Sequence, residues 1–304
     1  MSTKTTIAIA GITSKLAIRV VSSLLKRPDV LVRGSCRSTS KLPSFIRVNP
    51  RVSLIQAGPY DTEALRRLVS GCNAVVCCYY ADNETMTSGQ KLLVDLCEEE
   101  GVPRYLASDY TSDYRNLDEG EGLAKEPMKH VLAYLLTKKR VKGVHILIGL
   151  LMETWWSFCS GWDIENMRFT VWGTGDEKWD ITSYQTAAEY VAAVALDSSA
   201  VGVLKFLGER KSTREIARTM ESIYGVKPSL ESIGSMEECE KRRWGDGQDA
   251  LIAAAAYFCT GKGSLGEDLD NLRYPEIKPE TFEDFFKSRD ITKLSDDDFA
   301  IALK

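Results

Sequence analysis

The sequence predicts an α/β fold, with a Rossmann-type doubly wound parallel sheet followed by a smaller, mostly helical C-terminal lobe. Short apolar runs alternate with helical patterns through the first half of the chain, and this β-α-β-α order is typical of a parallel sheet with helices on both faces. The first apolar run ends at Gly11, and a helical pattern starts directly after it. The second half lacks the alternation. We therefore expect a cofactor-binding domain over residues 1–150 and a substrate-binding lobe over residues 151–304, between which the chain crosses back.

The elements follow from hydrophobic periodicity. In the first half, strands are expected at Thr5–Ala10, Val30–Cys36, Val52–Gln56, Ala74–Tyr79, Arg104–Ala107 and Val144–Leu150. The helices expected between them are Lys15–Lys26, Thr62–Ser70, Thr87–Glu99 and Met128–Lys139, with a loop or brief helix over Thr39–Asn49. In the second half we expect a hairpin over Met167–Ile181 and helices at Thr186–Leu196, Thr213–Tyr224, Met236–Lys241, Gln248–Phe258 and Phe282–Ile301.

Composition narrows the class of protein. The chain has 304 residues, of which 44% are apolar and 27% charged, as in soluble globular proteins. Its net charge of -4 gives no reason to expect nucleic acid or an anionic membrane as a partner. No apolar run is long enough to span a bilayer or to form a signal peptide, so a cytoplasmic location is expected. The eight cysteines contain no Cys-x-x-Cys pair and the chain has two histidines, which predicts free thiols and no metal site.

The first strand and helix predict a nucleotide phosphate site. Gly11 allows a sharp turn. The backbone N–H groups of Thr13, Ser14 and Lys15 are then expected at the start of the helix, in which Leu16 is the first apolar position. The positive end of the helix dipole favours an anion at this place. The usual fingerprint has three glycines, whereas the spacing here is Gly11-x-x-Ser14-x-x-Ala17. The alternative for this stretch alone is an ordinary strand–turn–helix start.

Basic residues follow the second strand, where the adenosine ribose of a dinucleotide would lie. An acidic residue at this place would accept a hydrogen bond from the ribose 2′-hydroxyl. Arg37 and Lys41 instead offer a fork of donors and a second positive charge to a phosphate. The pair therefore predicts NADP(H) as the cofactor, with a solvated basic turn as the alternative.

The fourth strand ends in Cys78, Tyr79 and Tyr80. In this fold the strand end lies under the adenine and ribose of the cofactor, so these residues are candidates to contact it. The alternative is that the two rings pack on the core.

These features resemble the NmrA-like family, the atypical short-chain dehydrogenases that include isoflavone reductase-like enzymes. The resemblance covers most of residues 5–230. It rests on the Gly11 turn, on the basic pair after the second strand, on the lead Ser70-Gly71-Cys72-Asn73-Ala74 into the fourth strand, and on the segment Gly101-Val102-Pro103-Arg104-Tyr105-Leu106-Ala107-Ser108-Asp109-Tyr110. Family members usually carry glycine at the positions of Ser14 and Ala17. The resemblance implies NADP(H) binding by Ser108 and a substrate near Asp109 and Tyr110.

The family's reductases usually carry a lysine on the helix after this segment, which holds the nicotinamide ribose and polarises or protonates the substrate. Lys129 best fits that position. A competing candidate is the pair Tyr134 and Lys138, spaced as in ordinary short-chain dehydrogenases. One helical turn separates the two, so the lysine could lower the pKa of the phenol.

The loop after the sixth strand contains Met152, Trp155 and Trp156. Family members use this loop to wall the substrate side of the nicotinamide, so adjacent indoles favour a flat, apolar, aromatic substrate. The alternative is a loop that packs in the core.

The function that we expect is an NADP(H)-dependent oxidoreductase of secondary-metabolite biosynthesis. Its substrate would be a hydrophobic, aromatic or alkaloid-like intermediate that accepts hydride at a C=C or C=N bond. Reduction could be coupled to ring closure or cycloaddition in the same pocket. The alternative from a different class is a non-catalytic NAD(P)-sensing regulator of the NmrA type, which would bind the cofactor and a protein partner without turnover.

Overall fold

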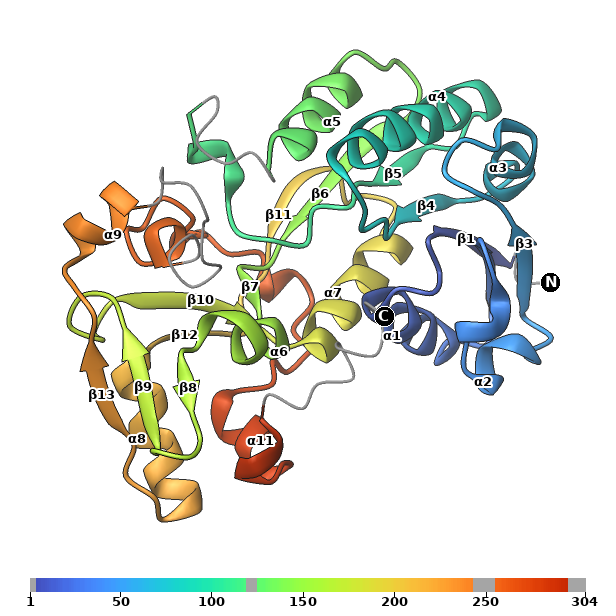
Figure 1. Ribbon diagram of the computed structural model, residues 1–304. Helices are drawn as coiled ribbons and strands as arrows, with labels where there is room; N and C mark the ends of the chain where they lie inside the picture. The colour runs from blue at the N-terminus through green and yellow to red at the C-terminus, as the bar shows by residue number, and fades with distance from the viewer. Residues whose placement is uncertain (1–3, 119–124, 243–254, 295–304) are drawn as a thin grey trace. The chain divides into compact units, whose positions relative to one another are not determined.

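The computed structural model describes residues 4–118, 125–242 and 255–294, and it divides the chain into two compact units (Figure 1). The first unit consists of residues 1–110, 118–147 and 187–204, and the second of residues 111–117, 148–186 and 205–304. Each unit is therefore assembled from separate stretches of the chain.

The first unit is built on a seven-stranded sheet in the order β11-β6-β5-β4-β1-β2-β3. Its strands are β1 (Thr5–Ala10), β2 (Val30–Cys36), β3 (Val52–Gln56), β4 (Ala74–Cys77), β5 (Arg104–Leu106), β6 (Lys142–Leu147) and β11 (Gly202–Lys205). The neighbouring strands from β3 to β6 pair in parallel. The Rossmann-type fold predicted from the sequence is thus confirmed, and β11 is an additional edge strand that the sequence analysis did not predict.

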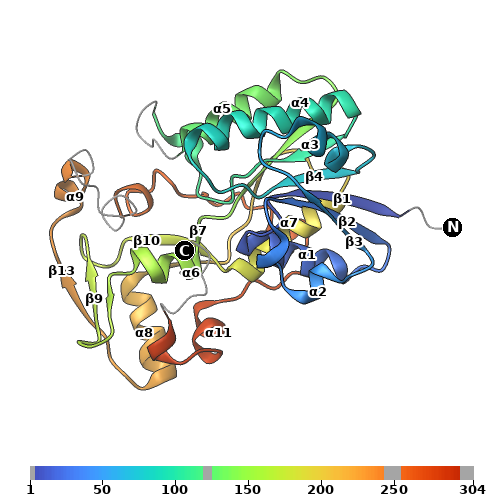
Figure 2. The same ribbon diagram turned by 45° about the vertical axis from the view of Figure 1, so that its right-hand side comes forward.

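Helices cover both faces of this sheet (Figure 2). They are α1 (Lys15–Leu25), α2 (Ser44–Arg47), α3 (Thr62–Val69), α4 (Gln90–Glu100), α5 (Glu126–Leu136) and α7 (Tyr184–Leu196), with short turns η1 (Thr39–Lys41) and η2 (Thr85–Gly89). Figure 1 shows α3, α4 and α5 on one face and α1 and α7 on the other. The apolar sides of α3 and α4 bury Leu65, Leu68, Leu93 and Cys97 against the sheet, which is why these segments are amphipathic.

Arginine side chains bind the C-terminal carbonyl groups of α1 and α7. The guanidinium of Arg104, which is 4% exposed, donates to the carbonyls of Val194 and Ala195 at the end of α7. Arg51 donates in the same way to the Leu25 carbonyl at the end of α1. Cations at a helix C-terminus satisfy carbonyls that have no partner within the helix and complement the dipole.

The second unit contains two three-stranded sheets beside its helices, in the orders β12-β10-β7 and β13-β9-β8. Its strands are β7 (Leu150–Leu151), β8 (Trp162–Asp163), β9 (Arg168–Val171), β10 (Lys178–Thr182), β12 (Glu209–Ser212) and β13 (Ser229–Ser232). Its helices are α6 (Met152–Thr154), α8 (Thr213–Tyr224), α9 (Met236–Arg242) and α11 (Phe282–Lys287), with short turns η3 (Tyr114–Asn116), η4 (Trp155–Cys159), η5 (Asn271–Arg273) and η6 (Ile291–Lys293).

The hairpin predicted over Met167–Ile181 is wrong. β9 and β10 flank the glycine turn as expected, but they belong to different sheets and do not pair with each other. The Glu177 carboxylate accepts from the backbone N–H groups of Thr174 and Gly175, which shapes the connection as a loop between sheets. Most of the predicted helix Gln248–Phe258 and the end of Phe282–Ile301 lie outside the described residues.

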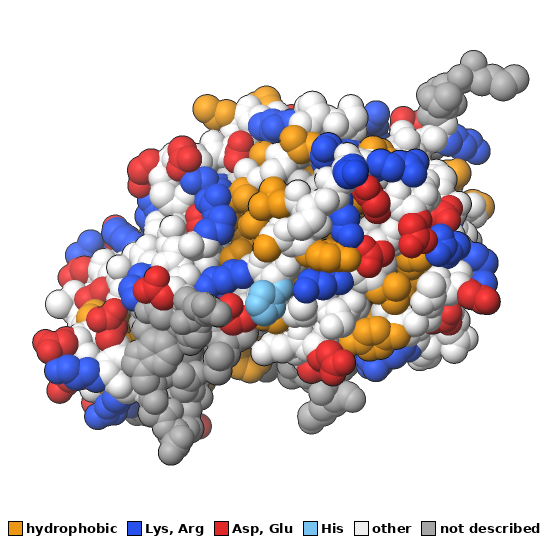
Figure 3. Space-filling view, turned by 90° about the horizontal axis from the view of Figure 1, so that it is seen from above, with side chains coloured by type: hydrophobic (Ala, Val, Ile, Leu, Met, Phe, Trp, Pro, Cys, Tyr) orange, Lys and Arg blue, Asp and Glu red, His pale blue; other side chains and the backbone are white. Residues whose placement is uncertain are grey.

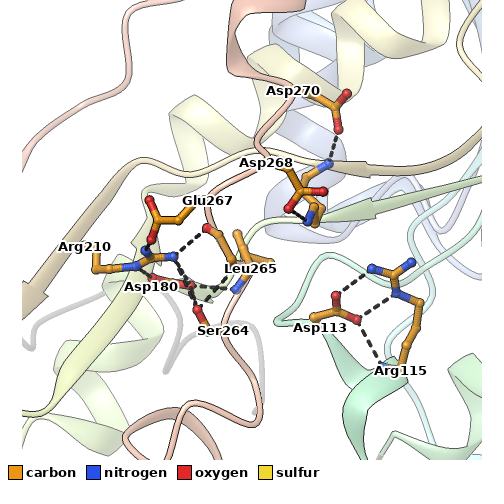
Figure 4. A network of polar contacts seen from close by, with 11 residues as sticks. Asp113, Arg115, Asp180, Arg210, Ser264, Leu265, Glu267, Asp268 and Asp270 are labelled. Carbon is orange, nitrogen blue, oxygen red and sulfur yellow. Dashed lines mark hydrogen bonds and ion pairs between the residues drawn. The ribbon is translucent and has the colours of Figure 1, made fainter.

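A buried carboxylate holds one loop of the second unit in place (Figure 4). Asp180 is 4% exposed, and its oxygens accept from Arg210, from the Ser264 hydroxyl and from the Leu265 N–H. Arg210 also pairs with Glu267. Because burial of a charge is costly unless it is paired and hydrogen-bonded, this network fixes the loop on β10 and β12.

The turn between β1 and α1 needs glycine for two reasons. Gly11 has φ +78°, and a Cβ built there would lie 2.9 Å from the carbonyl oxygen of Cys78. Gly71 has the similar value of φ +70°, but a Cβ there would meet nothing within 4 Å. Comparison of the two positions therefore distinguishes the effect of a left-handed backbone conformation from the effect of close packing.

We expect Gly11→Ala to lower the free energy of unfolding more than Gly71→Ala does. The second variant bears only left-handed strain and should cost about 1 kcal/mol, whereas overpacking against Cys78 should raise the cost of the first to about 3 kcal/mol. Urea unfolding followed by circular dichroism measures both values. Equal losses would contradict the close approach that the structure shows.

Candidate cofactor and substrate site

The predicted site residues of the first unit lie at the carboxyl ends of neighbouring strands. Gly11 follows β1, Arg37 follows β2, Cys78 follows β4 and Ser108 lies just beyond β5. Because these strands are parallel, their carboxyl ends share one edge of the sheet, and open α/β sheets bind ligands at that edge.

The Gly11 turn has the form of a phosphate cradle. Ser14 is the N-cap of α1, and its hydroxyl oxygen accepts from the Ala17 N–H at 3.1 Å. The first N–H groups of a helix lack acceptors within it and attract anions. Leu16 is buried under the turn, while Thr13 and Lys15 are partly exposed. The missing Cβ at Gly11 lets the turn pack against Cys78, and the N–H groups at the start of α1 fit the phosphates of a dinucleotide.

Arg37 and Lys41 are both exposed. The structure shows neither side chain in a hydrogen bond or ion pair with any residue that it describes. Lys41 ends the short turn η1, whose N-cap Ser38 accepts from the Ser40 N–H. Two free cations at the end of β2 can reach a phosphate without breaking an existing contact.

The end of β4 lies against the Gly11 turn. The Cys78 N–H donates to the Ala10 carbonyl at 2.8 Å, and burial raises the pKa of the Cys78 thiol. The Tyr79 ring is partly buried, with its Cδ1 atom 3.2 Å from the Cβ position of Gly11. Tyr80 is 78% exposed. Tyr79 therefore forms part of the wall of the turn, and Tyr80 is open to a ligand.

The segment after β5 is rigidly held. The Ser108 hydroxyl donates to the Tyr79 carbonyl at 2.7 Å. Asp109 is 4% exposed, and its Oδ2 lies 2.7 Å from Nδ1 of His145 on β6. The Tyr110 hydroxyl donates to the Cys77 carbonyl. Burial raises the pKa of the Tyr110 phenol well above its usual value, so it stays protonated.

The lysine predicted from the resemblance is engaged by its neighbours. Lys129 Nζ donates to the Asp118 carbonyl at 3.0 Å and to the Glu126 carboxylate at 3.2 Å. Lys125, which the sequence analysis did not single out, lies one helical turn earlier, and its carbonyl accepts from the Lys129 N–H. Burial lowers the pKa of Lys125 to about 8, and the charge of Asp109 opposes that shift. Lys125 thus differs from Lys129 in having a lowered pKa at the start of the same helix.

Tyr134 and Lys138 lie together, as the spacing predicts, but both are bound to Asp95 of α4. The Tyr134 hydroxyl donates to this carboxylate at 2.7 Å, and Lys138 Nζ does so at 2.6 Å. The ammonium also lies 3.9 Å from the centre of the Tyr134 ring. These contacts join α5 to α4, which favours a structural role for the pair over a catalytic one.

The tryptophans predicted to wall the substrate are interior residues of the second unit. Trp155, Trp156 and Met152 are 0%, 2% and 0% exposed. Trp155 packs edge-on against Trp156 and Phe282, and further rings from β8, β9, β10 and α11 complete the cluster. The structure thus favours the alternative, core packing, because an indole without exposed surface offers no face to a ligand. Sequence alone could not separate the two, since tryptophan is common in both settings.

The second unit also contains a cavity of about 400 Å³ beside the Asp180 network, lined in part by Arg210, Phe258 and Ser264.

The described residues include no group of three or more side chains placed to bind a metal ion. All eight cysteines are free thiols. None of the described helices has both the length and the apolar character to cross a membrane. On the face drawn in Figure 3, basic and acidic side chains are interspersed rather than gathered into a single stripe.

Comparison with known proteins supports a cofactor-binding domain in the first half of the chain. Residues 11–145 match the model of a family described as NAD(P)H-binding. No curated protein sequence matches the chain significantly. The match begins at Gly11 and ends at His145, so it spans the turn, the basic residues after β2 and the segment after β5.

Solved structures match nearly the whole chain. An isoflavone reductase structure has a TM-score of 0.75 at 15% identity and covers 94% of this chain and 99% of its own. A structure of the pinoresinol-lariciresinol and phenylcoumaran benzylic ether reductases has a TM-score of 0.79 at 14% identity, over 94% and 99% of the two chains. The leucoanthocyanidin reductase of Vitis vinifera, solved with NADPH, has a TM-score of 0.77 at 15% identity, over 93% and 98%. The chain therefore carries an NAD(P)H-binding domain and has the fold of the isoflavone reductase-like proteins.

Proposed function

We propose that this protein is an NADP(H)-dependent reductase that acts on a C=C or C=N bond of a hydrophobic, aromatic or alkaloid-like intermediate of secondary metabolism. The observation that carries the proposal is the shared sheet edge of an NAD(P)H-binding domain, where the Gly11 turn follows β1 and the exposed Arg37 and Lys41 follow the neighbouring strand β2.

The preference for NADP(H) over NAD(H) rests on charge. A guanidinium and an ammonium after β2 attract a 2′-phosphate, and no acidic residue follows this strand to bind a 2′-hydroxyl. The structural relatives support the same cofactor, because a leucoanthocyanidin reductase was solved with NADPH and a further relative with NADP+ and pinoresinol.

The substrate class rests on the reductases that share the fold, which are named for isoflavones, pinoresinol and leucoanthocyanidins. The tryptophans Trp155 and Trp156 are buried, so they give no support to an aromatic substrate. Coupling of reduction to ring closure stays a finer version of this proposal, and no residue of the described structure favours it over simple reduction.

We assign the proton-handling role to Lys125, with Lys129 as the residue that the resemblance indicates. When bound, the reduced nicotinamide supplies the hydride. An ammonium at Lys125 would then give its proton to the atom that gains negative charge and would regain one from water. A pKa of about 8 suits this exchange, because a general acid works best when its pKa lies near the working pH. Lys129 is held instead by Glu126 and by the Asp118 carbonyl.

Titration with NADPH and NADH tests the cofactor. We expect NADPH to bind at least about tenfold more tightly than NADH, and Arg37→Ala to remove most of that preference, since a charged hydrogen bond contributes about 1.5–3 kcal/mol. Nicotinamide fluorescence measures both affinities. Arg47→Ala, which removes an exposed charge from α2 in the same β2–β3 connection, is the matched control and should leave the preference unchanged. Absence of binding by either nucleotide would overturn the proposal.

Substitution of the two lysines tests the chemistry. We expect Lys125→Met to lower the rate of NADPH oxidation about a hundredfold or more, the usual contribution of a positioned general acid, while Lys129→Met retains most of it. The assay uses a panel of aromatic enones and cyclic imines. A large loss in Lys129→Met alone would return the role to Lys129. Binding of NADPH without turnover across the panel would favour the regulator that the sequence analysis kept as the alternative.

A further inference from the structure

Ser14 stands where the dinucleotide fingerprint has its second glycine, and its backbone does not require one. Its φ is -69° and its ψ is 153°, in the extended region that any residue adopts. In the fingerprint this glycine lets the backbone come close to the pyrophosphate. The side chain at position 14 therefore lies where a pyrophosphate is expected, in a domain that matches an NAD(P)H-binding family from Gly11 onward.

The turn before Ser14 is fixed to β2. The N–H groups of Gly11 and Ile12 both donate to the Ser35 carbonyl, at 3.1 and 3.0 Å. The Ile12 side chain is fully buried, and a Cβ at Gly34 would overlap its Cδ1 atom. The sheet thus holds the turn by its backbone and by the space that this glycine leaves, so the position of Ser14 is set before any ligand binds.

The N–H groups at the start of α1 differ in whether they have an acceptor. The Ser14 N–H donates to the Gly11 carbonyl at 3.1 Å, and the Ala17 N–H donates to the Ser14 hydroxyl oxygen at 3.1 Å. Among the described residues, the N–H groups of Thr13 and Leu16 have no acceptor. The first N–H groups of a helix need partners from outside it, and anions fit them. These two groups are therefore donors for a bound phosphate.

The Ser14 hydroxyl can donate one hydrogen in addition to the bond that it accepts. The Cys78 thiol lies within hydrogen-bond reach of this hydroxyl, and burial raises the pKa of the thiol well above its usual value. The sulfur therefore stays neutral, and a neutral sulfur is a weak acceptor. A phosphate oxygen is a stronger acceptor because it is charged. A phosphate above the turn would thus draw the hydroxyl hydrogen away from the sulfur.

We propose that the Ser14 hydroxyl donates its hydrogen to the pyrophosphate of the cofactor while its oxygen caps α1. The side chain then supplies a donor where glycine supplies only space. The pyrophosphate is common to NADPH and NADH, so this contact adds affinity without choosing between them. In the proposed function that choice belongs to Arg37 and Lys41. The inference rests on cofactor binding and is independent of the substrate and the reaction.

Nucleotide titration of the full-length protein tests the contact. We expect Ser14→Ala to weaken the binding of NADPH and of NADH by the same factor, about tenfold or more, because each loses a hydrogen bond to a charged group. Ser14→Thr keeps a hydroxyl that can cap and donate, so it should retain most of the affinity. Nicotinamide fluorescence measures all of these affinities.

Three results of this titration would overturn the proposal. The first is native affinity in Ser14→Ala. The second is a loss confined to NADPH, which would place the contact on the 2′-phosphate. The third is tighter binding by Ser14→Gly than by the native chain, which would show that the side chain obstructs the pyrophosphate.

A control separates loss of the donor from loss of the helix cap. Ser212 caps α8 in the same way, because its hydroxyl oxygen accepts from the Glu215 N–H at 3.2 Å. Ser212→Ala therefore removes an equivalent cap from the second unit. We expect both alanine variants to lower the urea midpoint of unfolding, but only Ser14→Ala to weaken nucleotide binding. Equal weakening in both would assign the effect to lost stability and overturn the proposal.

Phosphorus NMR of bound NADPH gives a second reading, because the pyrophosphate and the 2′-phosphate have separate resonances. We expect Ser14→Ala to move the pyrophosphate resonances and to leave the 2′-phosphate resonance in place, whereas Arg37→Ala does the reverse. Pyrophosphate resonances that are the same in the native chain and Ser14→Ala would contradict the contact. Absence of binding by either nucleotide would reject the proposed function together with this contact, whereas native affinity in Ser14→Ala would reject the contact alone.

Discussion

The close approach of two backbone segments at the ends of β1 and β4 is the constraint on which the first unit depends. The central strands can bring Gly11 and Cys78 together only because no side chain stands between them, and the Cys78 N–H then ties the two ends through the Ala10 carbonyl. This contact fixes the start of α1 and the position of Tyr79. Every other candidate cofactor residue is placed relative to that pair of strand ends, since the parallel register carries the constraint outward to β2 and β5.

Hydrophobic rhythm predicted the sheet well, because a buried parallel strand must be apolar along its length and a covering helix apolar on one side. The later strands escaped for the opposite reason. β11 contains only Gly202–Lys205 and lies at the edge, and β12 reads Glu-Arg-Lys-Ser, so neither carries an apolar run. The sequence left the setting of the tryptophans open, because it records the size of a side chain but not which neighbours enclose it. The rings that bury Trp155 and Trp156 come from residues up to 130 positions away, such as Phe285 and Phe286.

For the candidate lysine Lys125, a local sequence signal marks the start of its helix. Proline is favoured in the first turn of a helix, and Pro127 in fact lies there, so α5 begins at Glu126 rather than Met128. That shift of two residues brings Lys125 to the start of the helix, one turn from Lys129. Asp109 was predicted as a site residue, but its contact with His145 joins positions 36 apart and depends on the neighbouring placement of β5 and β6. No spacing rule in the sequence encodes it.

The edge strand β11 and most of α7 come to the first unit from residues 187–204, after the chain has already entered the second unit. Arg104 depends on these residues for its acceptors, since both carbonyls that it binds belong to α7. During synthesis Arg104 is therefore added to the chain some ninety residues before the helix end that accepts its hydrogen bonds. The nucleotide-binding unit cannot close as the ribosome delivers its first 150 residues; it reaches its final packing only once the intervening part of the second unit has also emerged. Folding of the two units is thus interlocked in time, although each has its own core.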